Sequence, residues 1–164
     1  MGVTAGYLMP HPPIMVEEVG GSETQRICAT VEAAHKVGKD IGELEPDTVV
    51  IISPHGHIFQ DALCVYDYPL KGDLSSFGAP QVRQDFEPDE ELREEILASS
   101  RREGLPVVPT SKVPMRKYGL KQELDHGVTV PMYFVGKYAS GFKLLPLSFG
   151  LLPYKDLYRF GRLI

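Results

Sequence analysis

The chain has 164 residues, of which 43% are hydrophobic and 24% are charged, and these values are typical of a single globular domain. The net charge is −5, and the one basic cluster is Arg101–Arg102. We therefore expect no nucleic-acid partner. No apolar run approaches the roughly 20 residues that a bilayer span needs, and the N-terminus lacks a basic region followed by a long apolar stretch. We therefore expect no membrane association and a cytoplasmic location. Cys28 and Cys64 lack a CxxC spacing, which predicts two reduced, buried thiols.

The first third of the chain predicts a β-α-β unit. The apolar stretch Val3–Met9 indicates a buried strand. Ser22, with a glutamine three residues further on, resembles the N-cap of a helix that ends before Pro46. Thr48–Ile52 contains four β-branched aliphatic residues in a row, as expected of a central parallel strand that is covered on both faces.

The remaining pattern alternates strands with helices. We predict strands at Leu63–Tyr66, Val107–Val108 and Lys143–Phe149, and helices over 89–103, over His126–Tyr138 and from Pro153. Residues 67–85 carry too many breakers for regular structure and suggest a lid or binding loop. The aromatic residues Tyr66, Tyr68 and Phe77 would either close over an aromatic substrate or pin this loop to the body. The last helix stops on two apolar residues, which suggests that more chain belongs after it.

Three histidines lie directly beside predicted elements. His11 follows the first predicted strand within a Pro-His-Pro-Pro segment, His55 follows the most hydrophobic strand, and His126 begins a predicted helix. Because parallel strands end at one edge of a sheet, His11 and His55 should emerge together, on backbone that the flanking prolines restrict. Two neutral imidazoles at one edge favour a divalent transition-metal site. An isolated histidine of this kind is more often an ordinary hydrogen-bonded residue, and that alternative stays open.

These segments, in this order, resemble the motifs of the LigB-like class III extradiol dioxygenases and the related Memo proteins. The resemblance rests on His11–Pro13, Ser53–Phe59 and Leu124–Pro131, with support from Gly78–Pro80 and Leu157–Gly161. It extends from about Val3 to the last residue and points to the branch found with the AmmeMemoRadiSam gene system. It implies an α/β fold, a three-layer α/β/α domain with a mostly parallel or mixed central sheet. Residues 1–164 would form the N-terminal portion of this single catalytic domain, incomplete at its C-terminal end.

The resemblance also implies roles for individual side chains. His11 and His55 would be metal ligands, for Fe(II) in the first place and Zn(II) as the alternative. His126 would line the substrate site and transfer protons, and its place at a helix N-terminus should lower its pKa. The residues expected to support the ligands or contact the substrate are His57, Asp125 and Tyr118. For Asp125 the main expectation is an N-cap, and for Tyr118 an exposed loop position explains the sequence equally well.

The third metal ligand of the family is a glutamate that lies downstream of the Tyr-Arg-Phe-Gly region, as does a further catalytic histidine. Neither has a counterpart in this chain, so we expect an N-terminal fragment of a longer protein. The alternative is a substitute carboxylate, for which the candidates are Glu17, Asp61, Glu123 and Asp125.

The function that the resemblance implies is Fe(II)-dependent insertion of O2 into a catechol-type aromatic diol. The partners would be this diol, O2, and a fused or neighbouring domain, and a homo-oligomer stays open. Two alternatives remain. One is a Memo-like metal protein with redox or hydrolytic activity on a non-catechol substrate. The other is a non-catalytic binding module of a radical-enzyme-associated system.

Overall fold

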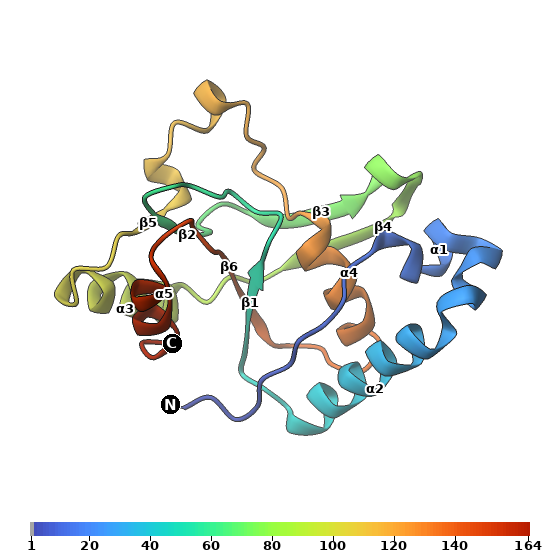
Figure 1. Cartoon of the computed structure of the whole chain (residues 1–164). Coiled ribbons are helices and arrows are strands. Elements are labelled where there is room, and N and C mark those ends of the chain that lie inside the picture. Colours follow the sequence, from blue (N-terminus) through green and yellow to red (C-terminus); the bar gives the residue numbers. More distant parts are fainter. Residues whose placement is uncertain (1) are drawn as a thin grey trace.

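A mixed four-stranded sheet with helices on both faces organises the chain (Figure 1). The computed structural model describes residues 2–164. The strands are β1 (Thr48–Ser53), β2 (Leu63–Val65), β3 (Leu70–Leu74), β4 (Ala79–Phe86), β5 (Val107–Pro109) and β6 (Lys143–Ser148). The helices are α1 (Glu17–Gly20), α2 (Cys28–Leu44), α3 (Glu90–Arg102), α4 (His126–Val135) and α5 (Tyr154–Gly161). The predicted α/β class is confirmed.

The sheet has the order β1-β6-β2-β5, and its strands run in both directions. β1 is parallel to β6 and β2 is parallel to β5, whereas β2 and β6 pair antiparallel. Side-chain alternation then divides the core into two layers. Leu63 and Val65 of β2 pack with α3 and α5, while Cys64 and Tyr66 pack with α2 and α4. A third cluster joins α2 and α4 to the β3–β4 hairpin.

Two predictions about the first third of the chain are wrong. Val3–Met9 forms no strand and is largely exposed, with Leu8 fully exposed and the Tyr7 hydroxyl donating to Asp40 of α2. β1 lies at an edge of the four-stranded sheet and not at its centre, and Ile52 is 51% exposed. The physical reason is that an apolar run shows only which side chains favour burial, whereas a strand and its place in a sheet require a partner strand that local sequence does not specify.

Three further expectations also need correction. Residues 67–85 are mostly the β3–β4 hairpin, whose turn reverses at Gly78 with φ 82°. Ser22 lies inside a 3-10 helix, Gly21–Ile27, without a side-chain cap, and α2 begins only at Cys28. The thiol expectation holds for Cys64, which is buried and free, but Cys28 is exposed.

The other predicted elements are confirmed. α3 shows the local signals most clearly, because Asp89 accepts a hydrogen bond from the Leu92 amide at its start and Gly104 follows its end with φ 64°. α4 keeps Pro131 inside the helix, within its second turn. Across residues 2–164, no helix combines the length and the apolar character that a membrane span requires.

α4 packs closely on α2 because two glycines leave space for its backbone. A Cβ on Gly38 would lie 2.7 Å from the Phe134 carbonyl oxygen, and one on Gly42 would lie 2.6 Å from that of Tyr138, in the turn that follows α4. Real Cβ atoms do not approach a carbonyl oxygen so closely, so these positions set the separation of the two helices.

We predict that Gly38→Ala lowers the free energy of unfolding by about 1–3 kcal/mol, because overpacking outweighs the gain in helix propensity of about 1 kcal/mol. Urea unfolding followed by circular dichroism measures the change. Gly161→Ala is the matched control, since a Cβ at this helical position meets nothing within 4 Å. Equal stability of the two variants would contradict the packing argument.

Candidate functional site

His11 and His55 meet side chain to side chain. Their Nε2 atoms lie 3.0 Å apart, although 44 residues separate them in sequence. His55 stands two residues after the end of β1, and His11 precedes a 3-10 turn, Pro13–Met15, in which Pro12 is the N-cap and proline occupies the first position. The prolines fix φ and so limit the paths that the backbone can take through this turn. The expected convergence of the two histidines is present, with His11 carried by a non-strand segment.

His126 completes a cluster of three imidazoles. It is the first residue of α4, and its ring centroid lies 4.0 Å from that of His55 and 5.9 Å from that of His11. Burial lowers the pKa of His126, and the neighbouring His55 lowers it further. The expected direction is therefore correct, with burial as the leading cause. A histidine with a lowered pKa is neutral at pH 7 and can accept a proton.

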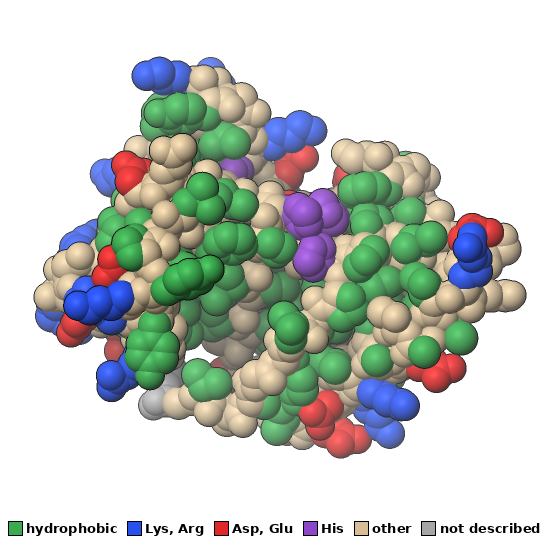
Figure 2. All heavy atoms as spheres, in the orientation of Figure 1, with side chains coloured by type: hydrophobic (Ala, Val, Ile, Leu, Met, Phe, Trp, Pro, Cys, Tyr) green, Lys and Arg blue, Asp and Glu red, His purple; other side chains and the backbone are tan. Residues whose placement is uncertain are grey.

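The cluster lies on the surface and is bordered by apolar side chains. Figure 2 shows histidine side chains gathered in the middle of one face, with hydrophobic atoms beside them. His55 is exposed, whereas His11 and His126 are half-buried. Phe77, in the turn between β3 and β4, is 41% exposed and places its ring centroid 5.2 Å from that of His126. The backbone amide of Ser75 donates to Asp73, which fixes this turn.

Asp125 serves as the N-cap of α4, as expected. Its Oδ1 accepts hydrogen bonds from the Gly127 amide and from the Ser53 hydroxyl. Ser53 is a site residue that sequence reasoning missed, because a single serine at a strand end is not a distinctive pattern. Its signal is tertiary: it is fully buried and hydrogen-bonded to a residue 72 positions away.

His57 and Tyr118 do not join the cluster. His57 is buried, with its ring stacked on Tyr66 at 5.4 Å, and burial lowers its pKa. Tyr118 is 57% exposed and its ring faces Phe59 at 6.4 Å. The side chain of His57 therefore belongs to the core, and that of Tyr118 to the surface of an exposed loop.

The substitute carboxylates suggested by the sequence do not complete a metal centre within the described residues. Across residues 2–164, no group of three or more His, Cys, Asp or Glu side chains is arranged to hold a metal ion. The histidine cluster thus supplies nitrogen donors from His11 and His55, and the part of the chain seen in the structure adds no carboxylate ligand to them.

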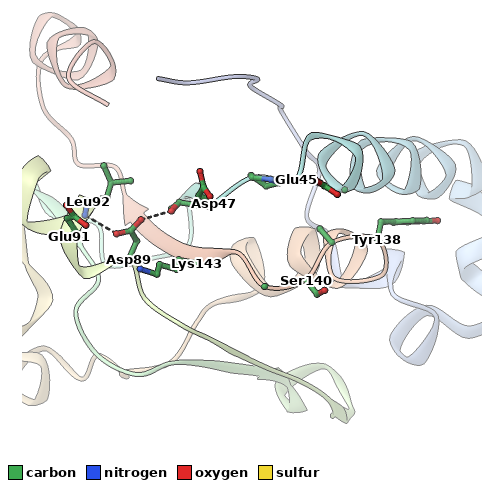
Figure 3. A pocket seen from close by; sticks show the side chains of 13 residues that line it. Glu45, Asp47, Asp89, Glu91, Leu92, Tyr138, Ser140 and Lys143 are labelled. Atoms are coloured by element: carbon green, nitrogen blue, oxygen red, sulfur yellow. Dashed lines mark hydrogen bonds between the residues drawn. The ribbon is translucent and has the colours of Figure 1, made fainter. Parts of the chain in front are cut away.

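A cavity of about 600 Å³ lies elsewhere, near the opposite ends of β1 and β6. Figure 3 shows its acidic lining, in which the side chains of Asp89 and Lys143 lie side by side. Asp89 is already engaged, since one carboxylate oxygen caps α3 and the other accepts from Thr48. None of the predicted site residues lines this cavity.

Fold and cluster together define an α/β protein that presents converging histidines where a strand and a helix meet. The family model for the catalytic LigB subunit of aromatic ring-opening dioxygenases matches residues 5–164. The chain belongs to this LigB family. It is also similar to protein CA_C1420 of Clostridium acetobutylicum, with 36% identity over 162 residues. That alignment covers 98% of this chain but 35% of the relative, so the chain spans about a third of the relative's length.

Proposed function

We propose that the chain carries the metal-binding histidines of an extradiol ring-cleavage dioxygenase, which inserts O2 into a catechol-type aromatic diol. The observation that carries this proposal is the 3.0 Å approach of the His11 and His55 Nε2 atoms, with the His126 ring 4.0 Å from that of His55. Membership of a family of ring-opening dioxygenase subunits supports it.

The donor pair fits a metal ion. Two imidazole nitrogens bound to one metal at about 2.1 Å lie about 3.0–3.4 Å apart, for angles between octahedral and tetrahedral. The His11–His55 separation of 3.0 Å, which is also that of a hydrogen bond between the two rings, lies at the short end of this range. Nitrogen donors suit both Fe(II) and Zn(II), and we propose Fe(II), because two histidines and one carboxylate form the facial triad of non-haem iron oxygenases. The carboxylate would come from outside residues 2–164, because the described residues add none.

The remaining residues of the cluster would act on the organic substrate. When bound, the metal would supply a Lewis acid with open coordination positions for a diol and dioxygen. His126, whose pKa is lowered by burial and which is therefore neutral at pH 7, would accept a proton from a substrate hydroxyl. Phe77 offers an aromatic edge beside it, against which a planar ring can pack. The partners of the chain would accordingly be a small aromatic diol and O2, in the cytoplasm.

We predict that His11→Ala and His55→Ala each abolish stoichiometric metal binding in the intact protein, because each removes one of two nitrogen donors. Metal content after reconstitution with Fe(II) or Zn(II), measured by elemental analysis, is the test. His57→Phe is the matched control, since it replaces a buried histidine two residues from His55 that stacks on Tyr66. Unchanged metal content in both alanine variants would contradict the assignment.

We predict that His126→Ala retains the metal but lowers kcat by about 10²–10⁴, the usual contribution of a general acid or base. Oxygen consumption by the iron-loaded protein with a panel of catechols measures the effect. If the wild-type protein consumes no oxygen with any catechol, the substrate class is wrong. If His126→Ala turns over like the wild type, its proton-transfer role is wrong.

We predict that Phe77→Ala raises KM for an aromatic diol about 2- to 10-fold and changes kcat less, because it removes an aromatic contact worth about 0.5–1.5 kcal/mol. Steady-state oxygen uptake gives both constants. Tyr154→Ala, at a 90% exposed aromatic position on α5, is the control and should leave both unchanged. An unaltered KM in Phe77→Ala would exclude a role in substrate binding.

A further inference from the structure

Ser53 lies at the junction between the two elements that carry His55 and His126. It is the last residue of β1 and is fully buried. Its hydroxyl donates to Oδ1 of Asp125 at 2.5 Å and accepts a hydrogen bond from the backbone amide of His55 at 3.1 Å. A single side chain therefore fixes the start of the His55 turn and contacts the cap of the neighbouring helix.

Asp125 continues this connection into α4. The same Oδ1 accepts a hydrogen bond from the Gly127 amide at 2.7 Å, in the first turn of the helix that begins with His126. One carboxylate oxygen thus ties the end of β1 to the start of α4. Its other oxygen is buried without a hydrogen-bond partner among the described side chains.

The junction has no spare room. A Cβ on Gly127 would lie 2.3 Å from Oγ of Ser53 and 2.8 Å from Oδ1 of Asp125, and within 3.4 Å of the His55 ring. The start of α4 therefore leaves no room for a side chain between the serine hydroxyl, the Asp125 carboxylate and the His55 ring. A shift of Ser53 would be transmitted to both histidines, because closely packed groups cannot move independently.

Ser148 provides an internal comparison. It pairs with Ser53 in register on the adjacent parallel strand β6 and is equally buried. Its hydroxyl donates to the backbone carbonyl of His57 at 2.7 Å. The two serines hold opposite ends of the His55–His57 turn, but the hydrogen bond to the Asp125 cap comes from Ser53.

We propose that Ser53, which is anchored by Asp125, is a positioning residue that fixes the turn carrying the ligand His55 and thereby sets the metal affinity of the histidine site. This inference rests on the proposed metal centre. Residues that orient metal ligands from behind contribute about 10- to 100-fold to metal affinity when they are removed. Ser53 and Asp125 act as one unit here, since a single hydrogen bond connects them.

The test is a double-mutant cycle on Co²⁺ binding to the intact protein, followed by the visible absorption of the bound ion. Ser53→Ala and Asp125→Ala should each weaken Co²⁺ binding about 10-fold and alter the Co²⁺ spectrum. The double variant should bind Co²⁺ with the same affinity as the single variant that binds it less tightly, because both changes break the same connection. Ser148→Ala should weaken binding less than about 3-fold, and its effect should multiply with that of Asp125→Ala.

Two results would overturn the inference while leaving the metal centre in place. One is a double variant whose fold-loss of Co²⁺ affinity equals the product of the losses in Ser53→Ala and Asp125→Ala. The other is an equal loss of affinity in Ser53→Ala and Ser148→Ala, which would reduce Ser53 to an ordinary buried serine. If wild-type protein and His55→Ala bind Co²⁺ equally, the proposed metal centre itself is wrong and the inference fails with it.

Discussion

The packing of α4 against its neighbours is the constraint on which the site depends. The start of α4 leaves no room for a side chain at Gly127 beside Ser53 of β1, and Gly38 and Gly42 of α2 lie against Phe134 of α4 and against Tyr138 in the turn that follows it. A Cβ on Gly72 of the β3–β4 hairpin would lie 2.7 Å from the Thr129 side chain of the same helix. Glycine thus lets one helix approach three elements closely, and this places His126 beside the strand end and the hairpin turn at once.

Local sequence signals predicted the elements well and their arrangement less well. The cap at Asp89, the glycine after α3 and the four consecutive β-branched residues of β1 are each visible within a few residues. The pairing of β1 with β6 joins Thr48 to Lys143 and depends on chain almost a hundred residues away. The antiparallel pairing of β2 with β6, which makes the sheet mixed, left no local signal in the sequence.

The same contrast between local sequence signals and long-range contacts explains which site residues could be predicted. His11 and His55 were expected to converge at the ends of two parallel strands, and they converge although His11 follows no strand. The prolines after His11 and the helical turn that follows them bring its ring to the same place by another route. Ser53 could not be found in this way, because its importance arises from a contact with Asp125 that exists only in the folded chain.

The charge around the cluster also bears on what it can hold. Asp125 is a partly buried carboxylate whose Oδ2 is without a hydrogen-bond partner and which forms none of the ion pairs seen among residues 2–164. A buried negative charge is costly unless a positive charge lies near it. Asp125 immediately precedes His126, whose ring lies 4.0 Å from that of His55, and a cation held by His11 and His55 would bring a positive charge to this part of the molecule. The cluster therefore combines imidazole nitrogen donors with a carboxylate that is hydrogen-bonded behind them, which favours a divalent cation over an anionic ligand at this position.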